Sequence, residues 1–407
     1  MSNHQDAIVE KRKKLKIVFY TDDYLPAVDG TVNYIVSARK ELERRGHRVY
    51  IFTAGNRETQ KITKKDRRVI VFKGISFTKY PQYTIAAQPQ FASTIKRINP
   101  DIIHMHTPFV MGVFATMAKK VTGAPLIGTF HTMVFSDEVL SHYLSKNKFV
   151  RRVAKSIIIR YLRYTYSKCD LVLTPSDYTR RELEKIGIKR IQTLHTGTIN
   201  RIHKKLSMNA SREKLGQSKS KHIMLYLGRV SHEKNIEVII RAAKALDKNG
   251  FDIVIAGSGP AEKSLKEMAA AKGASNVMFV GFIPKKQLCS YYSSADVFCN
   301  PSMFETLGQT TIEAMAEGVP VLVPKHSAQE EFTLRGNCGE TFNVKSTKDL
   351  IDKAVKIVNN RNRYSPASVA RKYSVTESTD ILLDAYYRML SEDDNLDPDK
   401  KHVIRLF

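Results

Sequence analysis

The chain of 407 residues contains no tryptophan and only four cysteines. It also has no long uninterrupted apolar segment. A membrane-spanning helix needs about 18 consecutive apolar residues, so none is expected. Residues 1–20 are polar and then basic, and they lack the apolar core and cleavage site of a signal peptide. Without CxxC spacing, we interpret the cysteines as small buried residues in a reducing compartment. These absences predict a cytoplasmic protein, and the cysteines concerned are Cys169, Cys289, Cys299 and Cys338.

Several catalytic signatures are missing as well. There is no GxGxxG dinucleotide fingerprint, no Asp-X-Asp motif after a strand-like run, and no facing carboxylate pair suited to glycoside hydrolysis. His104 and His106 alternate as strand residues do, but no third ligand accompanies them at the spacing of a metal site. We interpret them as a wall of a cleft or as structural residues. These segments therefore offer no recognisable metal or cofactor signature.

The residues that are present describe a globular and strongly basic chain. Hydrophobic residues make up 42%, and the formal net charge is +26. The first 200 residues carry 35 Lys and Arg against 16 Asp and Glu, and the rest carry 31 against 24. This field would attract nucleic acid, anionic lipid or anionic ligands, although a basic proteome would give the same totals. A chain of this length favours two domains over one core.

Strand-like and helical segments alternate in both halves of the chain, which predicts parallel sheets covered on both faces. We expect an α/β protein with two doubly wound, Rossmann-like domains facing a cleft, at residues 1–200 and 201–375. A closing helix is expected at 379–390, within a third segment at 376–407. Ligands should bind at the carboxyl ends of the strands. The expected strands are 16–21, 49–55, 101–106, 125–131, 171–175, 191–197, 222–229, 251–260, 276–284, 295–302 and 319–324.

Two turns between a strand and a helix carry residues suited to an anionic ligand. Gly30, in YLPAVDGT, would let backbone N–H groups approach a phosphate at a helix N-terminus. Arg229 and Lys234 bracket the turn GRVSHEK, as two cations that neutralise a diphosphate would. An ordinary βα turn and a solvated basic turn are the alternative interpretations.

The segment FETLGQTTIE places Glu305 and Glu313 eight positions apart around Gly308. On one continuous helix these side chains would point about 80° apart and could not share a ligand. We therefore expect Glu305 in a loop and a helix that begins near Leu307 and Gly308, with free N–H groups for an anion. Glu305 would then accept hydrogen bonds from sugar hydroxyls and Glu313 from a ribose. Alternatively, both are ordinary surface residues.

Together these segments resemble the GT-B retaining glycosyltransferases of family 4, which include phosphatidylinositol mannosyltransferases and diacylglycerol glucosyltransferases. The two glutamates match the C-terminal signature of that family, and GRVSHEK matches its donor-phosphate element. Where the family usually has Gly-Gly in the N-terminal loop, this chain has Asp29-Gly30, so only Gly30 carries over. The resemblance extends from Ile17 to about Tyr387, and it implies that the closing helix in segment 376–407 crosses back to the N-terminal domain.

The resemblance implies a nucleotide-sugar donor, with UDP-hexose the first expectation. It also implies no tightly bound cofactor and no metal requirement for the chemistry. Arg229, Lys234 and the amides of Gly30, Leu307 and Gly308 would hold its diphosphate and stabilise it as it leaves. Glu313 would hold the ribose and Glu305 the sugar.

The same resemblance assigns the rest of the donor cleft. The backbone around Phe282 and Ile283 would bind the base, and Gly257 would line the cleft. His131 would contact the donor sugar near the reacting carbon, with a purely structural histidine as the alternative.

Residues 139–169 carry eight basic residues and no acidic one. On a helical wheel, five apolar or aromatic residues gather on one side, which we interpret as the core face. Ile159 and Leu162 fall among the cations of the other side, a pattern typical of an interfacial membrane helix. The alternative is a solvated helix on which Ile159 and Leu162 pack against a neighbouring element. The five residues are Val150, Val153, Ile157, Tyr161 and Tyr164, and the opposite cations include Lys148, Arg152, Lys155 and Arg163.

The sequence thus predicts a retaining glycosyltransferase that moves a hexose, glucose from UDP-glucose first, to a lipid such as diacylglycerol. Segment 146–168 would bind an anionic membrane surface and hold the enzyme peripherally on the cytoplasmic face. A polyprenyl-linked or soluble glycan acceptor is the second interpretation. A nucleic-acid-binding α/β protein is the interpretation of another class. No RNA- or DNA-binding module is recognisable, so no nucleic acid partner is expected.

Overall fold

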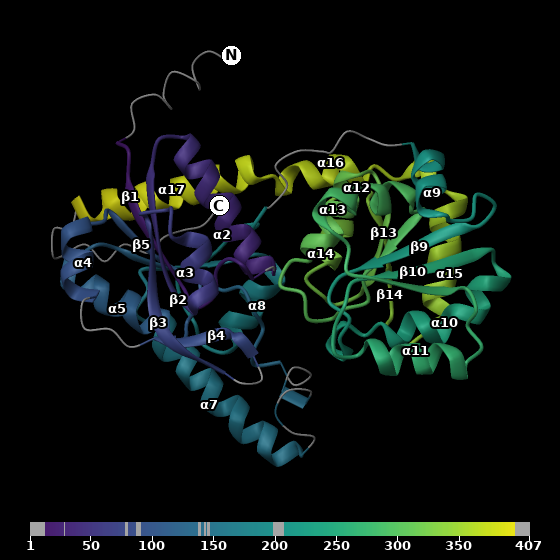
Figure 1. The fold of residues 1–407 in the computed structure, drawn as a ribbon, viewed down its shortest axis with the longest axis horizontal. Helices are drawn as coiled ribbons and strands as arrows, with labels where there is room; N and C mark the ends of the chain where they lie inside the picture. The colour runs from purple at the N-terminus through teal and green to yellow at the C-terminus, as the bar shows by residue number, and fades with distance from the viewer. Residues whose placement is uncertain are drawn as a thin grey trace, which may run out of the picture.

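The computed structural model describes residues 13–27, 29–77, 80–86, 91–136, 140–141, 144, 147–197 and 207–394. Two α/β domains lie beside each other, each built around one twisted sheet (Figure 1). This is the doubly wound arrangement that the alternating pattern predicts. Within the described residues, no helix is long and apolar enough to cross a bilayer.

The sheet of the N-terminal domain has eight strands in the order β4-β3-β2-β1-β5-β6-β7-β8. Its centre is apolar on both faces because helices cover both, and five of the six residues of β1 are buried. All neighbours pair in parallel except β4, which is antiparallel to β3. The strands are β1 (Lys16–Thr21), β2 (Arg48–Gly55), β3 (Val69–Phe77), β4 (Tyr80–Ala86), β5 (Ile102–Met105), β6 (Leu126–Thr129), β7 (Leu171–Thr174) and β8 (Ile191–Thr193).

Helices from the first half of the chain pack on this sheet. Asp29 caps the first of them by accepting a hydrogen bond from the Val32 amide at 2.8 Å, so that helix begins at Gly30. The helices are α2 (Gly30–Arg44), α3 (Arg57–Thr63), α4 (Phe91–Ile98), α5 (Val110–Thr122), α7 (Lys148–Tyr166) and α8 (Asp177–Lys185).

The sheet of the C-terminal domain has six parallel strands in the order β11-β10-β9-β12-β13-β14. Strand β14, like β3 and β4, lies at or near a sheet edge and was not anticipated from the sequence. The strands are β9 (His222–Leu227), β10 (Phe251–Ala256), β11 (Val277–Gly281), β12 (Val297–Cys299), β13 (Val321–Pro324) and β14 (Gly339–Phe342). The helices are α9 (Met208–Leu215), η1 (His232–Lys234), α10 (Glu237–Lys248), α11 (Glu262–Ala271), α12 (Lys285–Ser294), α13 (Gln309–Ala316), α14 (Glu330–Leu334), α15 (Thr347–Asn359), η2 (Arg361–Arg363), α16 (Pro366–Ala370) and η3 (Arg371–Tyr373).

The last helix, α17 (Val375–Asp394), leaves the C-terminal domain and packs on the N-terminal one (Figure 1). Leu382 and Tyr386 are buried in the same core cluster as Ile17 and Phe19 of β1. An ion pair between Arg45 and Asp380 joins α17 to the end of α2. The chain therefore closes on the domain from which it started.

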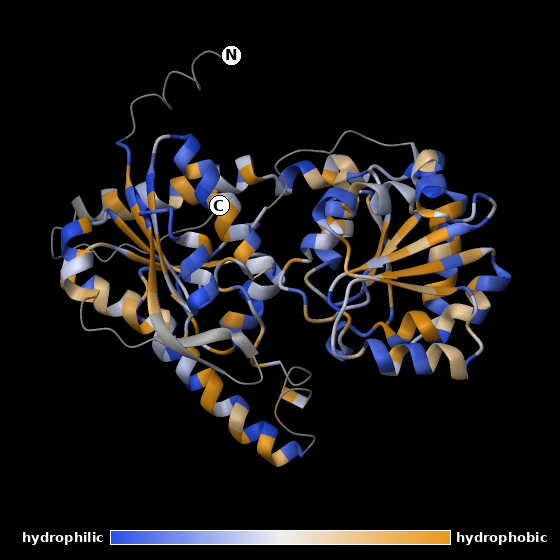
Figure 2. Ribbon diagram, in the orientation of Figure 1, coloured by the Kyte–Doolittle hydropathy of each residue, from blue (hydrophilic) through white to orange (hydrophobic). Residues whose placement is uncertain are grey.

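Helix α7 is oriented opposite to the sequence interpretation. The predicted core face is exposed, with Ile157 at 64% and Tyr164 at 66%, whereas Leu162 is completely buried. Ile159 packs against the same core cluster as Leu162, as the alternative interpretation proposed. Figure 2 shows hydrophobic and hydrophilic residues alternating along this helix, which projects from the domain. The predicted core face was wrong because only the last turns of α7 contact the sheet, through the residues that lie among the cations.

Three of the four cysteines are buried, as the sequence predicts. Cys169, Cys299 and Cys338 are buried, whereas Cys289 is half-buried on α12. All four are free thiols.

Candidate active site

The carboxyl ends of the two sheets face each other and their loops are in contact, and we call the region between these ends the cleft. Thr306, in the loop after β12, donates its hydroxyl to the His131 carbonyl after β6 at 2.9 Å. Gln309, the first residue of α13, donates to the Gly30 carbonyl at 2.9 Å. The loop that carries Glu305 is therefore in contact with both sequence-predicted residues of the N-terminal domain.

Lys234 and Glu305 form an ion pair in this cleft, with Nζ and Oε1 2.6 Å apart. Lys234 ends the short helix η1, and Asn235 follows in the left-handed region with φ of 56°. Both charged side chains are about one-fifth exposed, so a ligand can reach them. Arg229 lies in the same turn with an exposed side chain, and its guanidinium has no partner among the described residues. The turn thus offers one paired and one unpaired cation.

Helix α13 begins as the sequence predicted, with Glu305 in the preceding loop. Gly308 is the cap with φ of +93°, and the cap makes no side-chain hydrogen bond. The first N–H groups of the helix are therefore available to an anion. A Cβ at Gly308 would lie 2.8 Å from Oε1 of Gln329, whose amide group donates to the Ser302 carbonyl at 3.1 Å. Buried Gln329 thus holds this loop from beneath.

Gly257 fixes the contact between two other loops of the cleft. Its φ is +126°, and a Cβ there would lie 1.8 Å from the carbonyl oxygen of Gly228. Its amide donates to the Gly281 carbonyl at 2.7 Å. Because Gly228 precedes Arg229, the absence of a side chain at Gly257 determines where the arginine turn can lie.

The residues expected to contact base and ribose lie farther along the C-terminal domain. Glu313 accepts a hydrogen bond from the Tyr292 hydroxyl at 2.6 Å, so it is more than an ordinary surface residue. Phe282 is 67% exposed, whereas Ile283 is buried in the core. Only the backbone of Ile283 can therefore face a ligand.

Three histidines form a stacked row that ends in the cleft. The rings of His104 and His106 are 4.1 Å apart, and those of His106 and His131 are 5.4 Å apart. His106 Nδ1 lies 3.1 Å from His131 Nε2. Burial lowers the pKa of His131 to about 3 and also lowers the pKa of His104 and His106, so all three are neutral at pH 7. His131 can therefore offer the cleft a neutral imidazole held by its neighbour.

The stacking of His106 on His131 could not be predicted from the sequence. His104 Nδ1 lies 2.5 Å from the Tyr386 hydroxyl of α17, and its Nε2 lies 2.6 Å from the Thr129 hydroxyl. Both nitrogens of His104 thus have protein partners. In the part of the chain that the structure describes, no group of three or more His, Cys, Asp or Glu side chains is suited to hold a metal ion.

Two carboxylates that were not predicted as site residues, Asp22 and Asp23, lie at the end of β1. Asp22 is buried and accepts the Met111 amide at 2.9 Å, at the start of α5. Burial raises the pKa of Asp22 to about 6. Burial, followed by the nearby Asp29, raises the pKa of Asp23 to about 8. The signal was the acidic pair TDD directly after a buried strand, on the N-terminal side of the cleft.

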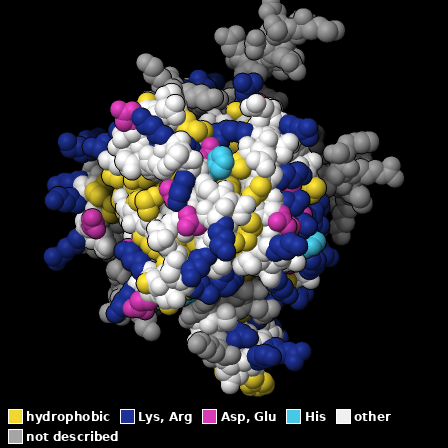
Figure 3. All heavy atoms as spheres, turned by 90° about the vertical axis from the view of Figure 1, so that its right-hand side faces the viewer, with side chains coloured by type: hydrophobic (Ala, Val, Ile, Leu, Met, Phe, Trp, Pro, Cys, Tyr) yellow, Lys and Arg dark blue, Asp and Glu magenta, His cyan; other side chains and the backbone are white. Residues whose placement is uncertain are grey.

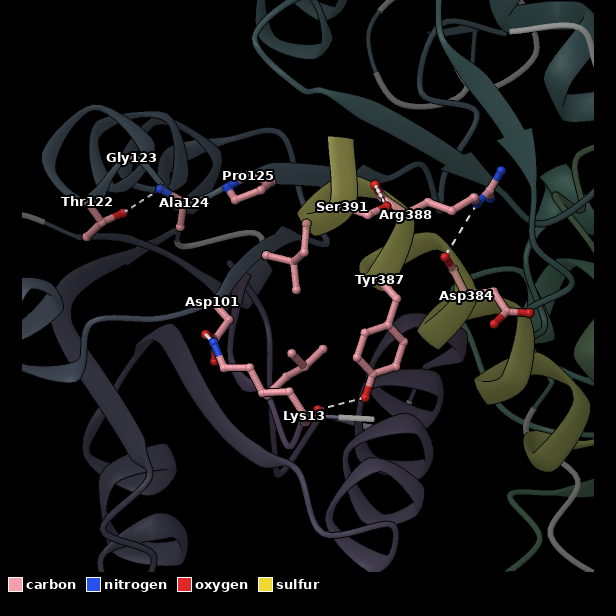
Figure 4. A pocket seen from close by; sticks show the side chains of 12 residues that line it. Lys13, Asp101, Thr122, Gly123, Ala124, Pro125, Asp384, Tyr387, Arg388 and Ser391 are labelled. Carbon is pink, nitrogen blue, oxygen red and sulfur yellow. Dashed lines mark hydrogen bonds and ion pairs between the residues drawn. The ribbon is translucent and has the colours of Figure 1, made fainter. Parts of the chain in front are cut away.

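A hollow of about 940 Å³ lies elsewhere in the N-terminal domain, between α17 and the amino ends of the strands (Figure 4). Lys13 and Asp101 line it, with Nζ and Oδ1 2.6 Å apart, and the Tyr387 hydroxyl donates to the Lys13 carbonyl at 2.8 Å. Ligands of such sheets bind at the carboxyl ends of strands, so this hollow is not the donor site.

Two family descriptions match the chain in tandem. "Glycosyltransferase Family 4" matches residues 28–198, and "Glycosyl transferases group 1" matches residues 207–372. The Alpha-monoglucosyldiacylglycerol synthase of Streptococcus pneumoniae is 30% identical over 319 residues, which cover 76% of this chain and 70% of the relative. The GDP-mannose-dependent alpha-mannosyltransferase of Corynebacterium glutamicum is 25% identical, covering 90% and 86%.

Solved structures share the two-domain architecture. Anabaena Alr3699/HepE in complex with UDP and glucose aligns with a TM-score of 0.70 at 17% identity, covering 92% of this chain and 99% of the other. Sucrose-phosphate synthase of Thermosynechococcus elongatus aligns with a TM-score of 0.72 at 16% identity, covering 94% and 100%. These likenesses establish the GT-B fold.

Proposed function

This chain belongs to the family 4 glycosyltransferases, and from that premise we propose that it moves glucose from UDP-glucose to a membrane lipid such as diacylglycerol, with retention of configuration. The observation that carries this proposal is the Lys234–Glu305 pair at 2.6 Å, on the loop that contacts the His131 carbonyl. It joins a phosphate-binding cation, a sugar-binding carboxylate and a residue of the opposite domain.

The donor diphosphate binds between Arg229, Lys234 and the amides of Leu307 and Gly308, with Gly30 closing the site from the other domain. The unpaired guanidinium of Arg229 and the uncapped start of α13 support this assignment. Both would neutralise the charge that develops on the diphosphate as the sugar leaves, so the reaction needs no metal ion. The Gly257 turn holds Arg229 in place.

The rest of the donor lies along the cleft. Glu313, held by Tyr292, accepts the ribose hydroxyls. The exposed Phe282 and the backbone of Ile283 hold the base. Glu305 accepts the sugar hydroxyls, and neutral His131 contacts the sugar near the anomeric carbon.

The transfer breaks the bond between the anomeric carbon and the diphosphate and forms a bond to the acceptor hydroxyl oxygen. The proton of that hydroxyl passes to the departing phosphate oxygen, so the atoms balance without a protein base. The acceptor enters from the N-terminal side of the cleft, beside the end of β1. The names of the relatives from Streptococcus pneumoniae and Acholeplasma laidlawii support a diacylglycerol acceptor. The cations of segment 146–168 support peripheral attachment at an anionic, cytoplasmic membrane face.

A second donor is favoured by a separate observation, because a GDP-mannose-dependent relative aligns over 90% of this chain. A polyprenyl-linked or soluble glycan acceptor would also fit the same donor site. The experiment therefore varies both partners.

The test incubates the protein with labelled UDP-glucose or GDP-mannose, and with vesicles that contain or lack diacylglycerol. We expect labelled glucosyldiacylglycerol from UDP-glucose alone, sensitive to an α-glucosidase and resistant to a β-glucosidase. Transfer from GDP-mannose would replace the donor assignment. Transfer only to water-soluble glycans would replace the acceptor. A β-linked product would contradict retention.

A further inference from the structure

Exposed apolar side chains are concentrated on two adjacent helices of the N-terminal domain. Fifteen large hydrophobic side chains are exposed among the described residues, and nine of them belong to α7, α5 or the residue that caps α5. Phe149 is 74% exposed, Tyr164 66% and Ile157 64%. Such a concentration on one surface indicates a partner, because apolar side chains scattered singly would not gather on neighbouring helices.

These side chains form one continuous surface, which we call the α5–α7 strip. On α7 it consists of Val150, Val153, Ile157, Tyr161 and Tyr164, spaced three or four residues apart on one side of the helix, together with Phe149 beside Val150. The Tyr161 hydroxyl donates to the Pro108 carbonyl at 2.6 Å, which places the strip beside the start of α5. There it continues as Phe109, Val113 and Met117, at intervals of four residues.

The opposite side of α7 is basic. Lys148 and Arg152 are exposed on it, and the whole helix contains no acidic residue. In Figure 3 the lower end of the molecule, where α7 projects, carries Lys and Arg side chains next to hydrophobic ones. A helix with one apolar and one basic side is suited to lie in the plane of an anionic bilayer surface. A second copy of this chain is a poorer partner, because both copies would carry the same formal net charge of +26.

We propose that the α5–α7 strip inserts into the headgroup region of an anionic bilayer and orients the active-site cleft toward it. The strip leads to the cleft, because the Met111 amide of α5 donates to Asp22 at the end of β1. A lipid acceptor could pass along it without leaving the membrane. The route to the cleft depends on the proposed lipid acceptor, whereas insertion of the strip does not.

Sedimentation with vesicles of phosphatidylglycerol or phosphatidylcholine tests the insertion. Phe149→Ser combined with Ile157→Ser should weaken binding to phosphatidylglycerol vesicles at least ten-fold, since each side chain would lose its burial in lipid. Ile62→Ser, on α3 of the same domain, and Leu334→Ser, on α14, remove comparably exposed side chains outside the strip. These matched controls should bind as the parent protein does.

Charge reversal separates attraction from insertion. Lys148→Glu combined with Arg152→Glu should weaken binding on the order of five-fold or more for each cation removed. Arg241→Glu combined with Lys248→Glu, on the exposed side of α10, gives the matched control with the same change in net charge. If the reversal on α7 weakens binding but the serine variants do not, the contact is electrostatic only and the strip does not insert.

A fluorescence probe gives a second measurement, because the chain contains no tryptophan. Ile157→Trp should show a blue-shifted emission on phosphatidylglycerol vesicles, and Leu334→Trp should not. An unshifted Ile157→Trp spectrum in vesicle-bound protein would overturn the proposal. So would a dimer that Phe149→Ser and Ile157→Ser convert to monomer while vesicle binding stays unchanged.

UDP-glucose binding by calorimetry separates this proposal from the proposed function. The strip variants should bind UDP-glucose normally, since the donor site lies on other elements. If the strip inserts but no lipid is glycosylated, the membrane-binding surface is supported and the proposed lipid acceptor is contradicted. If the protein glycosylates diacylglycerol in micelles but shows no vesicle binding and no fluorescence shift, the proposed function is supported and insertion of the strip is contradicted.

Discussion

Lys234 and Glu305 are 71 positions apart in the chain and meet only because β9 and β12 are neighbours in the second sheet. Their carboxyl ends place the two turns side by side, so a cation and a carboxylate converge on one ligand position. Both side chains are about one-fifth exposed, so the ion pair adds little to the stability of the fold. Its main role is to present a cation and a carboxylate to a ligand.

Lys234→Ala should reduce glucosyl transfer about 100- to 1,000-fold, the loss typical of removing one group that stabilises developing charge. Glu305→Ala should reduce transfer comparably by releasing the sugar hydroxyls. Turnover with labelled UDP-glucose measures the loss, and the thermal midpoint reports whether the fold is intact. Lys266→Ala removes a surface ion pair with Glu262 and should leave both unchanged. Near-normal turnover in either site variant would remove our assignment.

Gly257→Ala should lower the free energy of unfolding by roughly 3–5 kcal/mol, because φ of +126° is strained for alanine and the Cβ would meet the Gly228 carbonyl. Gly250→Ala is the matched control, since its φ is +77° and no atom lies within 4 Å of a Cβ there. It should cost about 1 kcal/mol. Urea unfolding measures the loss of unfolding free energy in both variants, and the difference between them is the contribution of the steric clash. Equal losses in the two variants would contradict the clash.

The buried histidines and the buried Asp23 should change the free energy of unfolding with pH in opposite directions. His106 and His131 have lowered pKa values, so they favour the folded state above about pH 6.5 and lose that contribution as pH falls toward 3. Asp23 has a pKa raised to about 8, so its contribution is present at low pH and is lost as pH rises through 8.

Urea unfolding between pH 5 and 7 can test both signs. His106→Gln should flatten the increase of stability with pH, and Asp23→Asn should steepen it. Each group changes the slope by up to about 1.4 kcal/mol per pH unit. A common direction of change in the two variants would contradict these pKa directions.

At the level of single elements, α17 belongs to the core of the N-terminal domain although it follows the C-terminal one. Leu382→Ala should therefore lower the unfolding free energy by about 2–5 kcal/mol, the usual cost of a cavity at a completely buried leucine. Leu334→Ala removes a 76% exposed leucine and should change stability by less than about 0.5 kcal/mol. Hydrogen exchange should locate the loss in β1 and α2, and a loss confined to the C-terminal sheet would show that α17 does not stabilise the first domain.

Helix α7 shows why periodicity alone could not assign a buried face. Its sequence has a good apolar stripe, and a helical wheel identifies that stripe without knowing where the sheet lies. Leu162 and Tyr166 face the sheet instead, and the helix extends beyond the domain, so most of the stripe has nothing to cover it. Which side of an amphipathic helix is buried is a property of its neighbours.

At the scale of the whole molecule, ion pairs and hydrogen bonds join the two domains. Arg335 after α14 contacts Asp177 of α8 at 2.7 Å, and Glu331 accepts the Asp177 amide at 3.2 Å. The Ser176 hydroxyl also donates to the Thr306 carbonyl at 2.7 Å. These contacts close the cleft around the site where the donor is proposed to bind.

Arg335→Ala should favour an open arrangement of the domains. We expect a larger radius of gyration by solution X-ray scattering without donor, and a KM for UDP-glucose raised roughly two- to five-fold, since a partly exposed ion pair contributes about 0.2–1 kcal/mol. Lys356→Ala removes an ion pair with Glu340 inside the C-terminal domain and serves as control. An unchanged radius in Arg335→Ala would mean that other contacts keep the cleft closed.

The sequence by itself determined the two α/β domains, most central strands, and the positions of Glu305 and Gly308 around the start of α13. These features follow from local causes, namely apolar runs, glycine conformations and capping residues, which leave their mark on neighbouring positions. Strands β3, β4 and β14, which lie at or next to a sheet edge, were missed, because strands in such positions are under weaker pressure to be uniformly apolar.

Only the tertiary structure decided which distant residues meet. The stacking of His106 on His131, the contact of Gln309 with Gly30, the buried Asp22 and Asp23, and the outward apolar side of α7 all depend on how separate elements pack. Each element is consistent with several neighbours, and the free energy of burying their joint surface selects one arrangement. No single segment of the chain contains that information.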